Sequence, residues 1–458
     1  MSKPAGMIRA TPDRPTENEM RADAAALMQA ALDAVSPRKA IRQVLQLAGD
    51  TLRIAGREYP LSERGRLVVV GAGKASATMA QAVEEVLGDR IDEGLVITKR
   101  GQAAEYSGSR IQIVEGGHPT PDQAGLLGAH RIAELLEPLG PHDLVICLIS
   151  GGGSALLTLP ASGIELPALQ ELTGALLKSG ATINEINCIR KHLSRVKGGQ
   201  LARMAHPAAV VSLILSDVVG NPLDVIASGP TVPDPTTFED AWTTLERYGL
   251  IRGLNHSIRG RLQAGMTGAI PETPKEGDPV FRNTHNAIIG SNEVAARAAL
   301  LEAQNRGYNA LLLSTYVEGE ARHVARALAA IGKECIHSGI PLPPPACFIA
   351  GGETTVTISG KGTGGRNQEL ALAAAIALDG WPRVALATLA TDGGDGPTDA
   401  AGAFITGETA QRARNLGLSP LSYLGDNDSY LFFQQLGDAV VTGPTGTNVN
   451  DLTFILAR

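Results

Sequence analysis

Buried strands that end in glycine-rich loops are the feature that most limits how this chain can fold. Residues 67–70 and 144–149 are uninterrupted apolar runs, and glycines at 71, 73 and 151–153 follow them. A strand without polar alternation is buried on both faces, which is typical of parallel sheets covered by helices on both sides. The pattern therefore predicts an α/β fold, with loops in which the backbone can approach a ligand closely.

Strand and helix signals alternate along most of the chain. Further strands are predicted at 94–98, 111–114, 209–215, 287–289, 310–313, 347–350, 354–358 and 384–390. Helices are predicted at 19–35, 37–48, 74–87, 121–136, 166–179, 292–306, 319–331, 367–378 and 428–436. The glycine pair at 351–352 is interpreted as a turn between two of these strands.

A segment rich in Gly, Pro and charged residues at 265–284 is the best candidate for a domain boundary. Because the strand–helix pattern restarts after it, we expect two α/β domains, at residues 19–270 and 280–458. The polar, proline-bearing residues 1–18 are predicted to form a disordered tail. They lack the apolar core of a secretion signal.

Composition and charge exclude several classes of function. The formal net charge is −7 at pH 7, so there is no basic surplus for nucleic acid or for an anionic membrane. No run approaches the ~20 apolar residues that a membrane-spanning helix needs. The four cysteines form no C-x-x-C pair, and a reducing cytoplasm is the simplest interpretation of Cys147, Cys188, Cys335 and Cys347.

The first glycine loop carries a lysine, Lys74, at the expected start of a helix. Helix N-termini attract anions, so a lysine there favours phosphate. The loop matches neither common nucleotide motif, however. Val68 occupies the first glycine position of a P-loop and Ala75 follows the lysine, while Ser76 replaces the third glycine of the dinucleotide pattern. A solvated lysine in an ordinary turn remains the alternative.

The loops after two other strands also favour anion or metal chemistry. Residues 150–154 form a Ser-Gly-Gly-Gly-Ser sequence, whose successive backbone N–H groups can converge on a phosphate or carboxylate. Asp217 follows the strand at 209–215 and could hold Mg²⁺ or act as a base. The alternatives are a flexible turn for the glycines and an Asx turn for the aspartate.

Two loops in the second half have opposite charge. Arg366 begins a predicted helix after Gly364-Gly365, where arginine is unfavourable unless an anion lies nearby; an ion pair with Glu353 or Glu369 is the alternative. The loop at 391–399 holds three aspartates, among them Asp392 and Asp395. Their mutual repulsion indicates either a cation such as Mg²⁺ or a solvated acidic loop.

Histidines and lysines outside these loops give weaker signals. His118, in a Gly-Gly-His-Pro sequence, is the one histidine in a plausible site loop. Lys191, Arg195 and Lys197, with Arg190 beside them, form a basic stretch that is usually a solvated helix face. Because glycines follow at 198–199, the lining of an anionic pocket is the alternative interpretation.

Eight of these motifs, in this order, resemble the glycerate 2-kinase family, whose C-terminal part is called the MOFRL domain. They are Gly71-Ala72-Gly73-Lys74-Ala75, Glu115-Gly116-Gly117-His118-Pro119, the segment 148–154, Leu215-Ser216-Asp217-Val218, Ser228-Gly229-Pro230-Thr231, Gly351-Gly352-Glu353-Thr354, Gly364-Gly365-Arg366-Asn367-Gln368-Glu369 and the segment 391–396. The resemblance covers nearly the whole chain from about residue 20.

The resemblance implies phosphorylation of D-glycerate at its 2-hydroxyl with ATP and Mg²⁺. It implies a Rossmann-like N-terminal domain, a second C-terminal α/β domain and an active site in the cleft between them. Lys74 and Arg366 are the implied key residues. The predicted site comprises the catalytic group Lys74, Arg366 and Asp217, the ligand-binding group Gly71, Gly73, His118, Ser150, Gly151, Gly152, Gly153, Ser154, Glu353 and Asn367, and the metal ligands Asp217, Asp392 and Asp395.

Two other functions and several properties stay open at this point. One alternative is an NAD(P)-dependent hydroxypyruvate reductase, supported by the Gly-Ala-Gly turn and by Lys99-Arg100 after the next strand. The other is a non-catalytic nucleotide-binding protein. The sequence leaves open the identity of the general base, the nucleotide preference and the oligomeric state, for which a homodimer is one candidate.

Overall fold

The computed structural model describes residues 15–61 and 65–458, and this part of the chain divides into two compact units. Residues 37–289 form one of them, called here the central unit. Residues 15–36 and 290–458 together form the other, called here the terminal unit.

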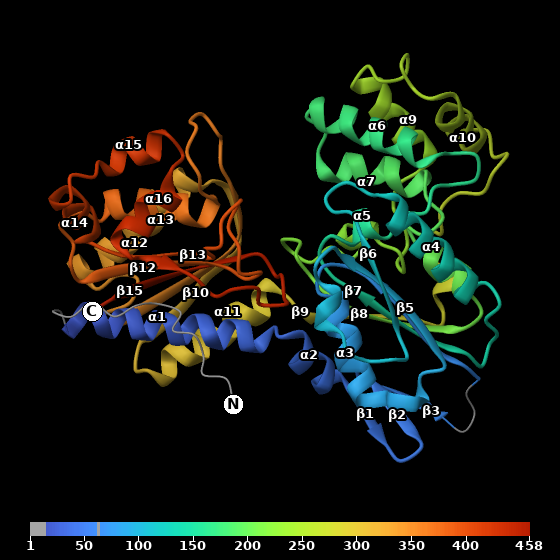
Figure 1. Ribbon diagram of the computed structural model, residues 1–458, viewed down its shortest axis with the longest axis horizontal. Helices are drawn as coiled ribbons and strands as arrows, with labels where there is room; N and C mark the ends of the chain where they lie inside the picture. The colour runs from blue at the N-terminus through green and yellow to red at the C-terminus, as the bar shows by residue number, and fades with distance from the viewer. Residues whose placement is uncertain (1–14, 62–64) are drawn as a thin grey trace. The chain divides into compact units, whose positions relative to one another are not determined.

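The central unit is built on a six-stranded sheet with the strand order β6-β5-β4-β7-β8-β9 (Figure 1). Its strands are β4 (Leu67–Ala72), β5 (Glu93–Lys99), β6 (Gln112–Gly116), β7 (Leu144–Ile149), β8 (Ala209–Leu215) and β9 (Thr284–Gly290). β4 pairs in parallel with both β5 and β7, and β6 and β8 continue the parallel pairing outward. Every residue of β4 and β7 is buried, which confirms the predicted parallel sheet.

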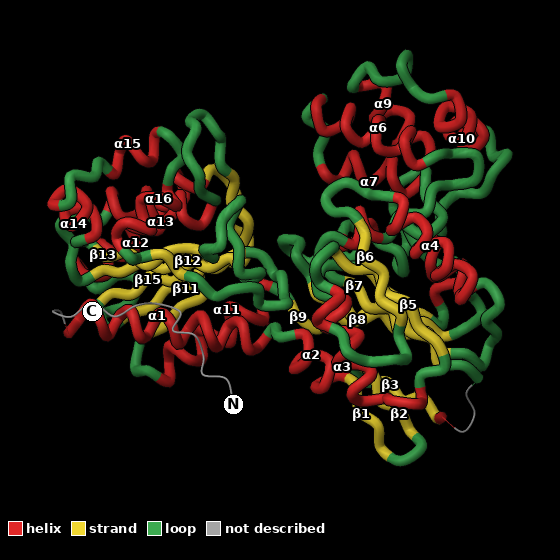
Figure 2. Tube along the Cα trace, in the orientation of Figure 1, coloured by secondary structure: helices red, strands yellow, loops and turns green. Residues whose placement is uncertain are grey.

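Helices cover both faces of this sheet, since alternate side chains of each strand point to opposite faces. Val69 and Ile146 pack with α2 (Pro37–Val44) and α3 (Ser76–Leu87), while Val68 and Val145 face α4 (Gln123–Leu136), α5 (Gly153–Leu156) and α8 (Gln200–Ala205). A separate helical cluster has its own apolar core (Figure 2) and consists of α6 (Leu166–Lys178), α7 (Ile183–His192), α9 (Phe238–Arg247) and α10 (His256–Met266).

Smaller elements complete the central unit. Three short antiparallel strands form a separate sheet: β1 (Leu45–Ala48), β2 (Thr51–Ile54) and β3 (Arg57–Pro60). Four 3₁₀ turns are η2 (Gly88–Arg90), η3 (Ala103–Glu105), η4 (Ile226–Ser228) and η5 (Pro279–Phe281). The helix predicted at 37–48 is therefore wrong in its second half, because Leu45 begins a strand that pairs with β2.

The terminal unit contains a mixed six-stranded sheet in the order β10-β11-β15-β12-β13-β14. Its strands are β10 (Asn309–Glu320), β11 (Ala346–Thr355), β12 (Val384–Ala390), β13 (Gly402–Thr406), β14 (Ala439–Val440) and β15 (Asp451–Ala457). One face packs against α12 (Ala321–Ser338), α13 (Arg366–Ala377), α14 (Thr409–Asn415), α15 (Pro420–Gly425) and α16 (Ser429–Leu436). The other packs against α1 (Pro15–Ala34) and α11 (Asn292–Asn305).

The position of α1 differs from the predicted domain division. Apolar side chains of α1, including Met20 and Leu27, are fully buried against α11 and the sheet of the terminal unit. Buried Arg21 donates to Asp438 at 2.8 Å and stacks over the Phe404 ring at 4.4 Å. The apolar face of α1 therefore assigns the N-terminal helix to the terminal unit, although it is far from that unit in sequence.

The predicted boundary at 265–284 also differs from the structure. This segment belongs to the central unit, where Pro274 O accepts from the Asp234 N–H and β9 adds the sixth strand to the sheet. The chain passes to the terminal unit only after Ile289. Of the predicted tail at 1–18, residues 15–18 open α1, and the rest lies outside the described residues.

The glycine pair Gly351-Gly352 does not form the predicted turn. Both residues lie inside β11, which runs on to Thr355. A Cβ on Gly351 would lie 1.8 Å from Asn292 Oδ1, and a Cβ on Gly352 would lie 2.1 Å from Val317 O. The glycines let α11 and β10 approach the strand closely, so the pair serves packing rather than chain reversal.

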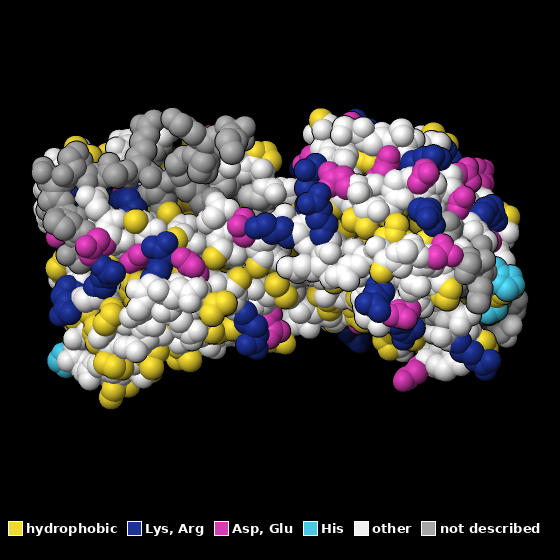
Figure 3. Space-filling view, turned by 90° about the horizontal axis from the view of Figure 1, so that it is seen from below, with side chains coloured by type: hydrophobic (Ala, Val, Ile, Leu, Met, Phe, Trp, Pro, Cys, Tyr) yellow, Lys and Arg dark blue, Asp and Glu magenta, His cyan; other side chains and the backbone are white. Residues whose placement is uncertain are grey.

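On the face in Figure 3, basic and acidic side chains lie interspersed rather than gathered by sign. Among the described residues, no helix has the length and apolar character to cross a bilayer.

The packing of α1 makes a prediction about stability. Leu27→Ala should lower the free energy of unfolding of the terminal unit by about 2–5 kcal/mol, because it leaves a cavity between α1 and the sheet. Urea denaturation followed by circular dichroism measures the change. The exposed Gln29→Ala on the same helix is the matched control, and equal stability of the two variants would contradict the assignment of α1.

Candidate functional site

The two glycine loops predicted to bind anions follow neighbouring strands at the centre of the sheet. In chain order the six strands lie as 3-2-1-4-5-6, the order of dinucleotide-binding folds. β4 and β7 flank the point where the order reverses, and ligands of open α/β sheets bind outside the carboxyl ends of strands at such a point. Lys74 and the 150–154 loop both follow these strand ends.

Backbone contacts hold the two loops together. The Lys74 N–H donates to Gly151 O at 2.8 Å, and the Ala75 N–H donates to Ser150 Oγ at 3.0 Å. Gly73 has φ +147°, and a Cβ there would lie 2.1 Å from Ser150 Oγ. Only glycine permits this approach, so the loops form a single rigid surface.

Gly71 has a packing role. It lies within β4, and a Cβ on it would meet Leu148 O of β7 at 2.2 Å. The side of Gly71 that a ligand would need to approach is therefore occupied by the neighbouring strand. Gly71 was predicted to bind a ligand, and in the structure it lies inside the sheet.

His118 lies against the second glycine loop. A Cβ on Gly152, which has φ +81°, would lie 3.0 Å from His118 Nε2 and 3.4 Å from Lys74 Cγ. Burial, with the positive charges of Lys74 and Lys99, lowers the pKa of His118 to about 4. The imidazole is therefore neutral at pH 7 and adds no charge to the site.

A cavity of about 440 Å³ opens beside these loops within the central unit. It is lined by several predicted residues, namely His118, Gly152, Gly153, Ser154 and Asp217. Helix α7 contributes Asn187 and Arg190. Arg190 and Asp217 are the only charged residues among the described residues that line it, apart from the neutral His118.

A chain of hydrogen bonds connects the glycine loop to α7. Ser154 Oγ lies 2.8 Å from Ser228 Oγ, which donates to Asn187 Oδ1 at 3.1 Å. Ser228 and its neighbour Ala227 both have positive φ, at 61° and 51°, although neither is glycine. Such strain persists where the surrounding structure holds the residue in place, and it concentrates at ligand-binding sites.

Lys197 supports the same loop from beneath. Its Nζ donates to Ser154 O at 2.7 Å and to Leu157 O at 2.6 Å, which are carbonyls of α5 and its C-terminal end. Complete burial, with the nearby charge of Arg190, lowers the pKa of Lys197 to about 7. The interpretation of this basic stretch as a solvated helix face is therefore wrong for Lys197.

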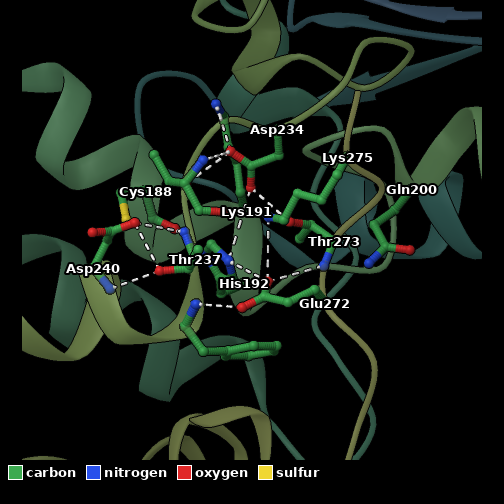
Figure 4. A network of polar contacts seen from close by, with 12 residues as sticks. Cys188, Lys191, His192, Gln200, Asp234, Thr237, Asp240, Glu272, Thr273 and Lys275 are labelled. Atoms are coloured by element: carbon green, nitrogen blue, oxygen red, sulfur yellow. Dashed lines mark hydrogen bonds and ion pairs between the residues drawn. The ribbon is translucent and has the colours of Figure 1, made fainter. Parts of the chain in front are cut away.

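It is also wrong for Lys191, which lies in a buried network at the end of α7 (Figure 4). Lys191 Nζ is 3.3 Å from Asp234 Oδ1, and Thr273 Oγ1 donates to Asp234 Oδ2 at 2.9 Å. His192 Nε2 is 3.1 Å from Glu272 Oε2. Burial alone would raise the pKa of Asp234, but Lys191 and further hydrogen bonds lower it. The network fastens α7 to two loops of the central unit.

The terminal unit holds the second group of predicted residues. Arg366 begins α13 and donates from Nε to Asp451 Oδ2 at 2.5 Å and from Nη1 to Glu353 Oε1 at 2.9 Å. Burial opposes the charged guanidinium, yet these carboxylates raise the pKa of Arg366. Burial raises the pKa of Asp451 to about 6, against the pull of Arg366. The ion pair with Glu353 was one of the two predicted alternatives.

A cavity of about 650 Å³ lies beside Arg366. Its lining includes Glu353, Gly365 and Asp395. Asn367 is buried, and its amide lies 3.4 Å from Asp395 Oδ1, so this predicted ligand contact is already engaged within the protein.

Asp395, which stays a predicted metal ligand, is engaged within the protein. Its carboxylate accepts from the backbone N–H of Asn367 at 3.1 Å and of Gln368 at 2.8 Å, which caps the N-terminus of α13. Burial raises the pKa of Asp395, and these hydrogen bonds oppose that rise. Asp392 accepts from the Gly394 N–H at 3.2 Å. Among residues 15–61 and 65–458, no group of three His, Cys, Asp or Glu is arranged to hold a metal ion.

Three functional candidates escaped prediction from the sequence: Asn187, Asp451 and the buried role of Lys197. Asn187 lies on a helix that the strand–helix pattern did not reveal, and Asp451 opens a strand near the C-terminus that also went unpredicted. The only sequence signal for the buried position of Lys197 was the glycine pair at 198–199 that follows it. They allow the chain to turn tightly past Asp234, which would lie 3.1 Å from a Cβ on Gly198.

Comparisons with known proteins agree with the resemblance found in the motifs. A domain of unknown function (DUF4147) matches residues 23–263, and the MOFRL family matches residues 346–451. A glycerate 2-kinase from Pyrococcus horikoshii is 42% identical over 431 residues, which cover 94% of this chain and 96% of that protein. The crystal structure of a glycerate kinase from Thermotoga maritima has a TM-score of 0.86 and 42% identity, covering 96% of this chain and 100% of that one.

Another relative carries a different name. A putative hydroxypyruvate reductase from Agrobacterium vitis is 43% identical over 427 residues, covering 92% of this chain and 95% of that protein. The names of the relatives therefore divide between two reactions, and the chemistry of the site must distinguish them.

The buried amine of Lys197 makes a prediction about pH. Its folded pKa of about 7 is below its ordinary 10.5, so between these values the unfolded chain holds a proton that the folded chain lacks. Relative to Lys197→Met, the stability of the wild type should therefore rise from pH 7 to pH 10, by at most about 1.4 kcal/mol per pH unit. Urea denaturation at several pH values measures this difference. The exposed Lys178→Met should show no such trend, and a pH-independent difference for Lys197→Met would contradict a depressed pKa.

Proposed function

We propose that this chain, which belongs to the glycerate 2-kinase family, transfers the γ-phosphoryl group of ATP to the 2-hydroxyl of D-glycerate, giving 2-phospho-D-glycerate and ADP. The observation that carries the proposal is the pair of glycine loops in backbone contact at the reversal of the strand order, with Lys74 on the first loop and a cavity beside them. Four unpaired, buried cysteines support the further proposal that the protein works in a reducing cytoplasm.

Phosphoryl transfer needs positive charge on the transferred group and a positioned hydroxyl. Lys74 supplies an ammonium group at the switch point. The 150–154 loop supplies backbone N–H groups, and contacts with the first loop hold it rigid. Asp217 lines the cavity and can accept the proton of the substrate hydroxyl as it attacks. Arg366 of the terminal unit stays a predicted phosphate contact, and in the structure its guanidinium pairs with Asp451 and Glu353.

Mg²⁺ is part of this proposal as the companion of ATP. It prefers oxygen ligands and keeps several waters, so it is commonly held by one or two carboxylates together with the phosphates. The donor set fits this mode, because the described residues offer single carboxylates rather than a metal cluster. Asp217 is the residue of the central unit that would hold it, and the ion would neutralise charge on the phosphates. Asp392, in the terminal unit, stays a predicted metal ligand.

The hydroxypyruvate reductase remains the second candidate, because one relative carries that name and the strand order is that of dinucleotide-binding folds. Two observations disfavour it. Ser76, at the third glycine position, is buried, and its Oγ donates to Gly73 O at 2.6 Å. His118, with a pKa of about 4, is neutral at pH 7, so it is not the imidazolium acid that would protonate a carbonyl during reduction.

Product analysis tests the function directly. With ATP, Mg²⁺ and D-glycerate, the protein should form ADP and a phosphate ester that phosphorus NMR identifies as the 2-phosphate. EDTA should abolish turnover and Mg²⁺ should restore it. The 3-phosphate would correct the regiochemistry alone. Oxidation of NADPH with hydroxypyruvate, without ATP turnover, would favour the reductase, and nucleotide binding without either reaction would favour a non-catalytic protein.

Lys74→Ala should lower kcat by more than tenfold, because it removes the ammonium group from the loop that we assign to phosphate. The fold should survive, since Lys74 contacts the second loop through its backbone N–H, which alanine retains. Steady-state kinetics with varied ATP and glycerate provide the measurement. The exposed Lys39→Ala on α2 is the control, and wild-type kinetics in Lys74→Ala would place this lysine outside the reaction.

A further inference from the structure

We propose that Arg190 forms the carboxylate subsite of the central-unit cavity, where its guanidinium pairs with the carboxylate of the acceptor 2-hydroxy acid. The identity of that acid as glycerate rests on the proposed function. The assignment of Arg190 to a carboxylate rests on the cavity itself.

Arg190 is partly buried in the cavity wall without a counter-ion. Within the described residues it makes no ion pair or hydrogen bond, and burial lowers its pKa. Lys197 is a basic neighbour whose pKa Arg190 helps to lower, so it offers no opposite charge. Other arginines in sheltered positions behave differently: Arg21 and Arg412 pair with Asp438, and Arg366 pairs with Asp451.

A buried guanidinium without a partner is unfavourable, because desolvation is not offset by an opposite charge. The unfavourable energy is relieved when an anion enters the cavity. Arginine matches a carboxylate well, since its two parallel N–H groups meet the two oxygens in one plane. Arg190 is therefore prepared for a planar anion that arrives with the ligand.

The rest of the lining favours a hydroxy acid over a polyphosphate. Among the described residues, the charges that line the cavity are those of Arg190 and Asp217, which cancel, so a ligand with a single negative charge is accommodated more readily than a triphosphate. Asn187 accepts from Ser228 through Oδ1, which leaves its N–H donors for a ligand oxygen. Ser154 and Thr173 add hydroxyl groups. This set suits a small molecule with one carboxylate and vicinal hydroxyls.

The buried network of Figure 4 holds the subsite in place. Lys191 and His192, the next two residues of α7, are fixed by Asp234 and Glu272. The backbone of Arg190 is thus anchored at the adjacent residue, while its side chain lines the cavity. A positioned arginine loses less side-chain freedom on binding and so binds more tightly.

Kinetics with two acceptors test the inference. D-Glycerate carries the carboxylate and glycerol lacks it. Arg190→Ala should raise KM for glycerate by about 100-fold, which lies in the range expected for truncating one partner of a sheltered ion pair. The same substitution should leave KM for ATP within about threefold of the wild-type value, because it removes no contact to ATP. The preference for glycerate over glycerol should fall by about 100-fold as well. Added guanidinium chloride should restore part of it, and Arg190→Lys should be intermediate because it keeps the charge without the fork.

Arg195→Ala is the matched control, since Arg195 lies five residues further on and pairs at the surface with Glu137. Circular dichroism and thermal unfolding confirm that each variant is folded. An unchanged KM for glycerate in Arg190→Ala and Arg190→Lys, or a rise in KM for ATP alone, would overturn the inference and leave the kinase proposal intact.

Calorimetric titration separates the inference from the proposed function. If the wild type fails to phosphorylate glycerate, the proposed function is wrong. Binding of D-glycerate and of hydroxypyruvate, which share the carboxylate, is then compared without ATP in the wild type and Arg190→Ala. Loss of binding in the variant supports the carboxylate subsite. Equal binding in both proteins, or no binding of either acid to the wild type, overturns it.

Discussion

The contact between the backbones of two neighbouring loops is the constraint on which the central unit depends. Gly73 and Ser150 lie so close that any side chain on residue 73 would collide with the serine hydroxyl. The same close approach continues down the strands, where Gly71 faces Leu148 O. Because parallel strands bring their carboxyl ends to one edge, this contact places the backbone of Lys74 beside the 150–154 loop.

Buried ion pairs hold the helices α1 and α7 in position. Arg21 ties α1 to Asp438 in the terminal unit, and Lys191 ties α7 to Asp234 in the central unit. A buried pair adds little net stability, but removing one partner is strongly unfavourable because the other charge then lies buried alone. Such pairs therefore fix position more than they stabilise. Arg190 is unlike these residues, since no carboxylate among the described residues pairs with it, and its position is fixed by its neighbours on α7.

The sequence predicted the parts of the structure that depend on local pattern. The strands β4 and β7 and their loops were found because an apolar run and a glycine cluster lie within ten residues. The α1 helix was found, but its partner was not, since only the fold brings Leu27 against α11. Burial of Lys191 was missed for the same reason: its carboxylate, Asp234, is distant in sequence. Asp395 looked like a metal ligand because the N–H groups it caps belong to another segment.

The strand order alone cannot decide between a kinase and a reductase, because the same order serves many chemistries. The glycine loop that carries Lys74 distinguishes between these two functions. A dinucleotide site needs a small third glycine so that the helix packs closely and the pyrophosphate reaches the helix N-terminus. Here Ser76 donates to Gly73 O and Ile97 O, which ties the start of α3 to its own loop and to β5. Those bonds hold the backbone that carries Lys74, two residues earlier. The residue that breaks the dinucleotide pattern is thus one that fixes the proposed phosphate-binding loop.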